Sequence, residues 1–267
     1  FPDVAGIVTR CGETDALDVN ERFRSRLLLR TARHARRFLS TLLPVFEKHR
    51  RRLIFRTWTV GAYPLGDLIW HRVTFRKVFG KLDSPSLVIS MKYGESDFFR
   101  YLPLNRHFFR SAHRKMIEFQ ARPEYEGFGE FPSFVGWDAS EYLQRAHEAE
   151  GLVGLSVWIQ TGGWGRFRRL TFLKKSSVWV ELNAFVLPRL FRGESCESAL
   201  RTFCSQHLDG VAPEPFMAFL EASDVAIKKL YYISEFAEQK LFFRRLRVPP
   251  QAFVFWDRII VNHTLRR

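Results

Sequence analysis

Short runs of apolar residues recur along the first part of the chain, and they are continuous instead of alternating with polar residues. Such runs, bounded by polar or turn-forming residues, are typical of strands in a parallel sheet that is covered on both faces. We predict strands at 4–10, 53–60, 87–92, 116–121 and 152–160.

Between these runs, apolar residues recur at the spacing of an amphipathic helix. Helices are predicted at 21–49, where Pro44 should bend or end the helix, and at 69–79. A third is predicted at 138–150, with Asp138 as a candidate N-cap. Beyond about residue 165 the pattern is helical, and we predict helices at 177–191, 195–207, 214–220 and 223–245.

Strands that alternate with helices predict an α/β fold built on a parallel sheet. Five such units are too few to close an eight-stranded barrel, so two architectures remain open. One is an open doubly wound sheet, and the other is the carboxyl-terminal part of a (β/α)8 TIM barrel. The sequence contains no glycine-rich loop after a predicted strand, which argues against nucleotide binding.

Composition excludes several classes of protein. The chain has 267 residues and a formal net charge of +14, but its basic residues are scattered and form no recognised nucleic-acid-binding motif, so we expect no nucleic-acid partner. Its three cysteines are too few for a disulfide scaffold, and no Cys or His group has metal-ligand spacing, so we expect no metal and no cofactor. We expect no membrane-spanning helix, and the cytoplasm is slightly favoured because no signal peptide is recognisable.

Polar side chains follow the predicted strands, where parallel α/β folds place their chemistry. Three strands are followed by the carboxylates Glu13, Asp97 and Glu124. Glycoside hydrolysis needs one carboxylic acid to protonate the leaving oxygen and another carboxylate to activate water or attack carbon. Nearby cations would bind an anionic sugar, and aromatic rings would stack on sugar faces. The candidate cations and aromatic residues are Arg56, Lys92, Tyr93, Tyr125, Trp58, Trp158 and Trp164.

The same residues have structural interpretations. An acid after a strand often caps or begins the next helix, as Glu13 would. Arg56, inside a predicted strand, could pair with a buried acid, and Trp58 and Trp158 could belong to the core.

Two motifs resemble those of a known family. Residues 92–99 read KYGESDFF and residues 117–127 read IEFQARPEYEG. They are similar to motifs of the α-glucuronidases of glycoside hydrolase family 67, in which one strand ends in Lys-Tyr-Gly with Asp-Phe close behind, and the next runs Glu-Leu-Gln and ends in Gln-Glu-Tyr-Leu-Gly. The strand LIFRTW, with Arg56, resembles the family strand that carries a substrate-binding Arg, and the segment ending in Glu13 resembles the strand of the general acid. The likeness extends in order and spacing over residues 4–165.

This resemblance implies an inverting α-glucuronidase-like enzyme of xylan degradation, which releases glucuronic acid from oligosaccharides. Glu13 would be the general acid, Asp97 and Glu124 would activate water, and Arg56 and Lys92 would hold the uronic carboxylate. Residues 1–165 would be the carboxyl-terminal part of the barrel, and residues 166–267 a helical region that could form a homodimer. The first three barrel strands have no counterpart, so we expect the chain to be incomplete on its own.

Two alternatives remain. The first is a non-catalytic or lyase-type protein that binds uronic-acid polymers through the same pocket. The second is a nucleic-acid-binding module, suggested by the net charge and by the basic run at 48–52.

Overall fold

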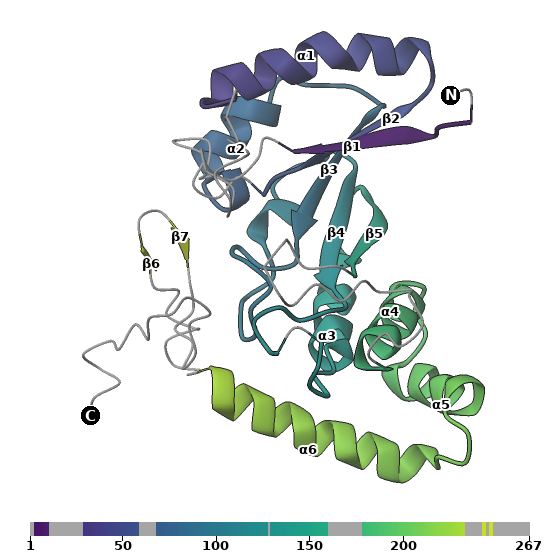
Figure 1. The fold of residues 1–267 in the computed structure, drawn as a ribbon. Coiled ribbons are helices and arrows are strands. Elements are labelled where there is room, and N and C mark those ends of the chain that lie inside the picture. The colour runs from purple at the N-terminus through teal and green to yellow at the C-terminus, as the bar shows by residue number, and fades with distance from the viewer. Residues whose placement is uncertain are drawn as a thin grey trace, which may run out of the picture.

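A parallel sheet lies at the centre of the computed structural model (Figure 1). The structure describes residues 3–10, 29–58, 68–127, 129–159 and 178–232, with the backbone of 242–243 and 246–247. The five strands of the sheet are β1 (Gly6–Arg10), β2 (Arg52–Arg56), β3 (Leu87–Lys92), β4 (Lys115–Gln120) and β5 (Leu152–Trp158). The prediction of a parallel sheet is therefore confirmed, and the predicted strands overlap the observed ones.

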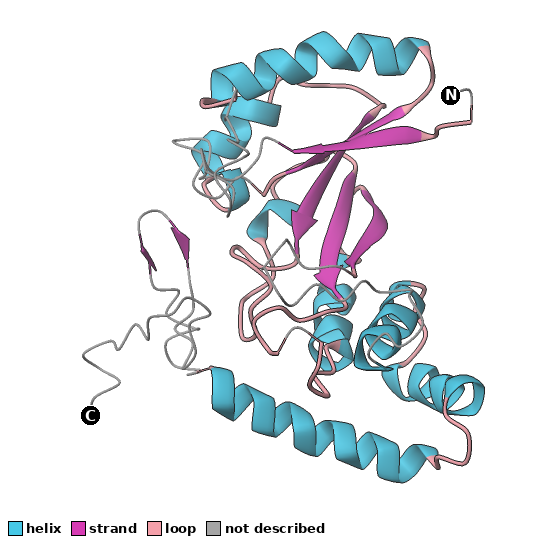
Figure 2. Ribbon diagram, viewed as in Figure 1, coloured by secondary structure: helices cyan, strands magenta, loops and turns pink. Residues whose placement is uncertain are grey.

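Helices alternate with these strands and continue after them (Figure 2). They are α1 (Ala32–Lys48), α2 (Arg72–Phe79), α3 (Gly136–Ala146), α4 (Val178–Phe191), α5 (Cys196–His207) and α6 (Pro213–Tyr231). A 3-10 helix, η2 (Arg106–Phe108), lies between β3 and β4. The short strands β6 (Phe242–Phe243) and β7 (Leu246–Arg247) form an antiparallel pair.

Local capping explains several helix boundaries. The Thr31 hydroxyl accepts a hydrogen bond from the His34 amide at 3.2 Å and begins α1, and Ser195 caps α5 in the same way. Pro44 does not end α1, which continues to Lys48. Asp138 is not an N-cap, because α3 begins two residues earlier at Gly136, and its carboxylate pairs with other elements instead.

The order of the strands follows the chain as β1-β2-β3-β4-β5, without a reversal in the described sheet. A doubly wound sheet contains such a reversal, so this order does not match that alternative. With right-handed crossovers, a sequential order places the connecting helices on one face of the sheet, which is compatible with part of a barrel.

The two faces of the sheet differ in chemistry. Side chains alternate along each strand, so Phe55, Ile89 and Ile117 share one face and pack in a single core with residues of α1 to α6. The opposite face carries polar and aromatic groups, although in β3 both faces are buried. Toward the carboxyl edge, this second face carries Arg56, Ser90, Lys92, Glu118, Gln120 and Trp158, and toward the amino edge it carries Ile54, Val88 and Met116. The second face is therefore polar near the carboxyl ends of β2, β3 and β4.

Candidate active site

The first feature of the carboxyl edge is a buried ion pair between β2 and β4. Arg56 donates from Nε to Oε1 of Glu118 at 2.8 Å and from Nη2 to Oε2 at 2.6 Å. Ser90, on the strand between them, donates to Oε1 of Glu118 at 2.7 Å. The Arg56 guanidinium also lies over the ring of Trp158, at 3.8 Å from its centroid. Arg56 therefore pairs with an acid of the protein, as the structural interpretation of this residue anticipated.

The second feature is the contact between Lys92, at the end of β3, and Asp97, in the following loop. The Lys92 ammonium donates to Oδ1 of Asp97, and both side chains are largely buried. The same ammonium lies 3.3 Å from the ring centroid of Trp58 and 4.1 Å from that of Phe98. Lys92 is thus enclosed by one carboxylate and two aromatic rings, and it holds Asp97 at the carboxyl edge of the sheet.

Asp97 receives two further donors. The Tyr125 hydroxyl donates to Oδ2 at 2.5 Å, and the Phe98 amide donates to Oδ1 at 2.8 Å. Charge-assisted hydrogen bonds of this kind are stronger than those between neutral groups, so they fix the orientation of the carboxylate. Of the predicted site residues, the structure therefore brings together Asp97, Lys92, Tyr125 and Trp58.

The other predicted site residues have different surroundings. Tyr93 belongs to the core: its ring stacks on Phe119 and Tyr142, and its hydroxyl donates to the Phe99 carbonyl at 2.7 Å. Burial raises the pKa of the Tyr93 hydroxyl well above its usual range. Glu124 is half-buried in the loop after β4, where its amide donates to Oε1 of Gln120 at 3.2 Å. Glu13 and Trp164 lie outside the described residues.

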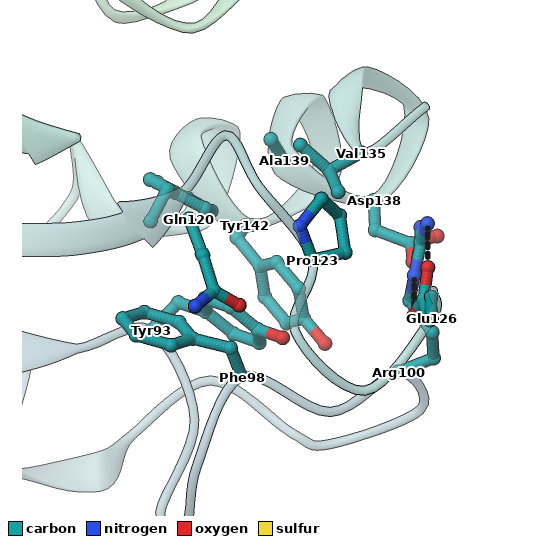
Figure 3. Close-up of a pocket in the computed structure, with 11 residues that line it drawn as sticks. Tyr93, Phe98, Arg100, Gln120, Pro123, Glu126, Val135, Asp138, Ala139 and Tyr142 are labelled. Carbon is teal, nitrogen blue, oxygen red and sulfur yellow. Dashed lines mark hydrogen bonds and ion pairs between the residues drawn. The ribbon is translucent and has the colours of Figure 1, made fainter. Parts of the chain in front are cut away.

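Beside this edge, Arg100 forms the centre of a second buried cluster (Figure 3). Its guanidinium donates to both carboxylate oxygens of Glu126, at 2.8 and 3.0 Å, and to Asp138 of α3 at 2.8 Å. From α6, Asp224 lies 3.4 Å from Arg100, and Lys228 donates to Asp138 at 2.8 Å. We call these five residues the Arg100 cluster.

The electrostatics of this cluster favour the charged forms of Glu126 and Asp138. Burial alone would raise the pKa values of Glu126 and Asp138, but the charge of Arg100 and its hydrogen bonds lower both below their ordinary values. Tyr232 contributes a further hydrogen bond to Glu126 at 2.7 Å. The cavity between this cluster, Tyr93 and Gln120 has a volume of about 20 Å³, which holds about one water molecule and no sugar. We therefore assign the Arg100 cluster a structural role.

Sequence reasoning missed Glu118, Ser90 and Arg100. Glu118 lies in one of the quoted motifs, and the alternation of side chains along a strand gives it the same orientation as Gln120. The two-residue alternation along the predicted strand could therefore have placed Glu118 on the same face as Gln120 from the sequence alone. No comparable signal pointed to Arg100, because its partners lie on a loop, on α3 and on α6, up to 124 positions away in the sequence.

Comparison with known proteins identifies no family for this chain. No protein-family model matches the chain. No curated protein matches it significantly. Within the described residues, no three His, Cys, Asp or Glu side chains are grouped as metal ligands. The helices of the described part are each too short or too polar to cross a membrane.

Proposed function

We propose that this chain carries the carboxyl-terminal part of a (β/α)8 catalytic barrel and acts as an inverting, α-glucuronidase-like glycoside hydrolase. One observation carries the proposal: Asp97 is a buried carboxylate at the carboxyl edge of a parallel sheet, held by Tyr125 and by Lys92, whose ammonium lies over the ring of Trp58. Parallel α/β enzymes place their catalytic groups at this edge. The sequential strand order also supports the barrel.

In the proposed reaction, the Glu13 carboxylic acid donates its proton to the glycosidic oxygen as the bond from that oxygen to the anomeric carbon breaks. Asp97, Glu124 or both accept a proton from a water molecule, whose oxygen attacks the anomeric carbon from the opposite face. The acid and the base in such a site are about 6.5–9.5 Å apart, which leaves room for that water. The products are the free uronic acid and the shortened oligosaccharide.

The contacts refine the roles of the two cations. Lys92 is a positioning residue for Asp97, because its ammonium is already bound to that carboxylate. Arg56 uses Nε and Nη2 for Glu118, which leaves Nη1 as the guanidinium nitrogen without a hydrogen bond to the described residues. We propose that Nη1 contacts the uronic carboxylate and that Trp158, stacked on Arg56, forms part of the sugar-binding surface.

The experiment is the release of glucuronic acid from aldouronic oligosaccharides. Substitution of the residue that activates water, by Asp97→Asn or Glu124→Gln, should lower kcat about 100-fold or more, and both substitutions should do so if the two residues act jointly. Tyr125→Phe should lower kcat about tenfold with KM unchanged, because one hydrogen bond to a charged group is lost. The exposed residues Asp209 and Glu148 provide matched controls, since Asp209→Asn and Glu148→Gln remove the same charge elsewhere. Full activity of both Asp97→Asn and Glu124→Gln would refute the assignment.

A second candidate is a carbohydrate-binding or lyase-type protein for uronic-acid polymers. It is favoured by the pairing of both predicted substrate cations with acids of the protein itself, Arg56 with Glu118 and Lys92 with Asp97. Saturable binding of oligogalacturonate by the wild-type chain, without release of any sugar, would support binding alone. Formation of an unsaturated product that absorbs ultraviolet light would indicate a lyase.

A further inference from the structure

A cationic groove lies away from the candidate active site, between α2 and the segments 80–85 and 107–114. Its volume is about 730 Å³, within the range of small-molecule sites. The two segments lead into β3 and β4, so the groove lies at the amino edge of the sheet. The candidate active site lies at the opposite, carboxyl edge, where Lys92 ends β3 and Asp97 follows it. We call it the amino-edge groove.

The connection between β3 and β4 explains why the groove exists. Other described connections between neighbouring strands contain an α-helix, such as α2 before β3 and α3 before β5. The β3–β4 connection instead contains the three-residue helix η2 and irregular backbone. Because this connection contains no α-helix to pack beside α2, a groove is left between α2 and the connection.

Charge in the amino-edge groove is strongly positive. Four arginines line it, together with a single acidic side chain, Asp83, which gives a formal charge of +3 (4 − 1) with histidines neutral. None of these arginines makes an ion pair with the described residues. They are Arg72 and Arg76 on α2, and Arg110 and Arg114 on the opposite wall.

The floor of the groove argues against sugar binding. Phe75 and Phe79 line it, but they are only 5% and 1% exposed, so they offer no open ring face on which a sugar could stack. His107 stacks on Phe75 at 4.0 Å and is 1% exposed, and neither of its ring nitrogens makes a hydrogen bond with the described residues. Burial, followed by the nearby Arg110, lowers the pKa of His107 to about 4. Recognition in this groove therefore depends on the guanidinium groups.

We propose that the amino-edge groove binds a compact compound that carries two or more phosphate groups. Planar guanidinium groups bind phosphate through paired hydrogen bonds, and several of them facing one hollow favour a concentrated negative charge over a single carboxylate. A bound polyphosphate would neutralise the positive charge of the arginines that line both walls of the groove. This site is independent of the proposed glycosidase activity.

Titration calorimetry of the 267-residue chain with sodium tripolyphosphate, at fixed ionic strength, tests the proposal. We expect saturable binding with one site per chain. Arg76→Gln combined with Arg110→Gln should weaken binding at least about tenfold, because charge-assisted hydrogen bonds are lost. The control combines Arg145→Gln with Arg192→Gln, two exposed arginines outside the groove, and should change the affinity less than about twofold. Circular dichroism checks that all variants are folded.

The outcomes are distinct. Equal weakening in the groove variant and in the control would mean that only the overall positive charge attracts the anion, and it would overturn the proposal. Absence of saturable binding by the wild-type chain would overturn it as well. If the chain binds oligogalacturonate more tightly than tripolyphosphate, and the groove variant abolishes that binding, the groove binds a uronic-acid polymer and the proposal of a polyphosphate ligand is overturned. Because no enzymatic activity is measured, these results do not depend on the proposed function.

Discussion

Arg56 and Glu118 form a buried, bidentate ion pair that joins two strands which are not neighbours in the sheet. Burying two charges costs desolvation energy, which the paired hydrogen bonds and the Ser90 hydroxyl offset. Such a pair adds little net stability compared with apolar residues, but removing one partner leaves an uncompensated buried charge. Its stability effect should therefore appear mainly when one partner is changed alone.

Glu118→Gln should lower the free energy of unfolding by roughly 3 kcal/mol, since it leaves Arg56 charged and buried without a carboxylate. Glu118→Gln combined with Arg56→Met should recover most of that loss, because the unpaired charge is gone. Urea unfolding of the two single variants and the double variant measures the coupling. Additive effects of the two substitutions would contradict the interpretation of the pair as one unit.

At this scale, the sequence predicted that Lys92, Asp97 and Tyr125 lie at the carboxyl edge, because each ends or follows a predicted strand, and it placed Arg56 inside the strand 53–60. It could not say which acid would pair with which cation. Glu118 is 62 positions from Arg56, and the pairing depends on the register of β2, β3 and β4. Register is a property of the assembled sheet.

At the scale of elements, the Arg100 cluster fastens α6 to the loops of the candidate site. Asp224 and Lys228 of α6 contact Arg100 and Asp138, and Glu126 of the same cluster directly follows Tyr125, which binds Asp97. The Tyr232 hydroxyl, just beyond α6, adds a hydrogen bond to Glu126. The position of α6 and the orientation of Tyr125 are thus linked through one buried network.

The cluster predicts sensitivity to acid. The pKa values of Glu126 and Asp138 are lowered in the folded chain, so their contribution to stability is complete above the unfolded-state values, which lie at about 4. That contribution is lost as the pH falls through the lower folded-state values. We expect the free energy of unfolding to decrease below about pH 4. Urea titrations at a series of pH values measure this slope.

Glu126→Gln is the informative variant for this slope. It should be less stable than the wild type at neutral pH and should lose less stability on acidification, because one of the shifted carboxylates is absent. The exposed Glu148→Gln should retain the wild-type slope. An unchanged slope in Glu126→Gln would show that other carboxylates dominate the acid response.

Helix boundaries also show where sequence patterns end. The predicted helix at 214–220 and the first part of the predicted helix at 223–245 form one helix, α6, because no helix-breaking residue lies between them. The helix does not extend to residue 245 as predicted, because 242–243 form the strand β6, which pairs with β7. Asp138 was predicted to cap a helix, but its carboxylate forms ion pairs with Arg100 and Lys228. These contacts arise only when α3 packs against α6 and the β3–β4 loop.

At the scale of the whole molecule, the net charge of +14 produces self-repulsion in the compact state. Exposed pairs such as Arg201 with Glu197 contribute little, since surface ion pairs are worth roughly 0–1 kcal/mol. The repulsion between many like charges acts over a longer range. Salt shortens that range from about 30 Å at 0.01 M to about 10 Å at 0.1 M.

The melting temperature should therefore rise as sodium chloride is increased from low to moderate concentration, as measured by calorimetry. The variant with Arg145→Gln and Arg192→Gln has a net charge of +12 (14 − 2) and should show a smaller rise. A fall in melting temperature with salt would mean that attractive ion pairs outweigh the repulsion.

The sequence by itself determined the α/β class, the positions of the strands and most helices, and the residue types gathered at the carboxyl edge. These follow from local periodicity and from the chain order of strands and polar residues, which a single sequence displays directly. Only the tertiary structure decided the sequential strand order, the pairing of Arg56 with Glu118 and of Lys92 with Asp97, and the Arg100 cluster. Each of these depends on side chains that meet after distant segments pack, and no local pattern specifies which distant partner satisfies a buried charge.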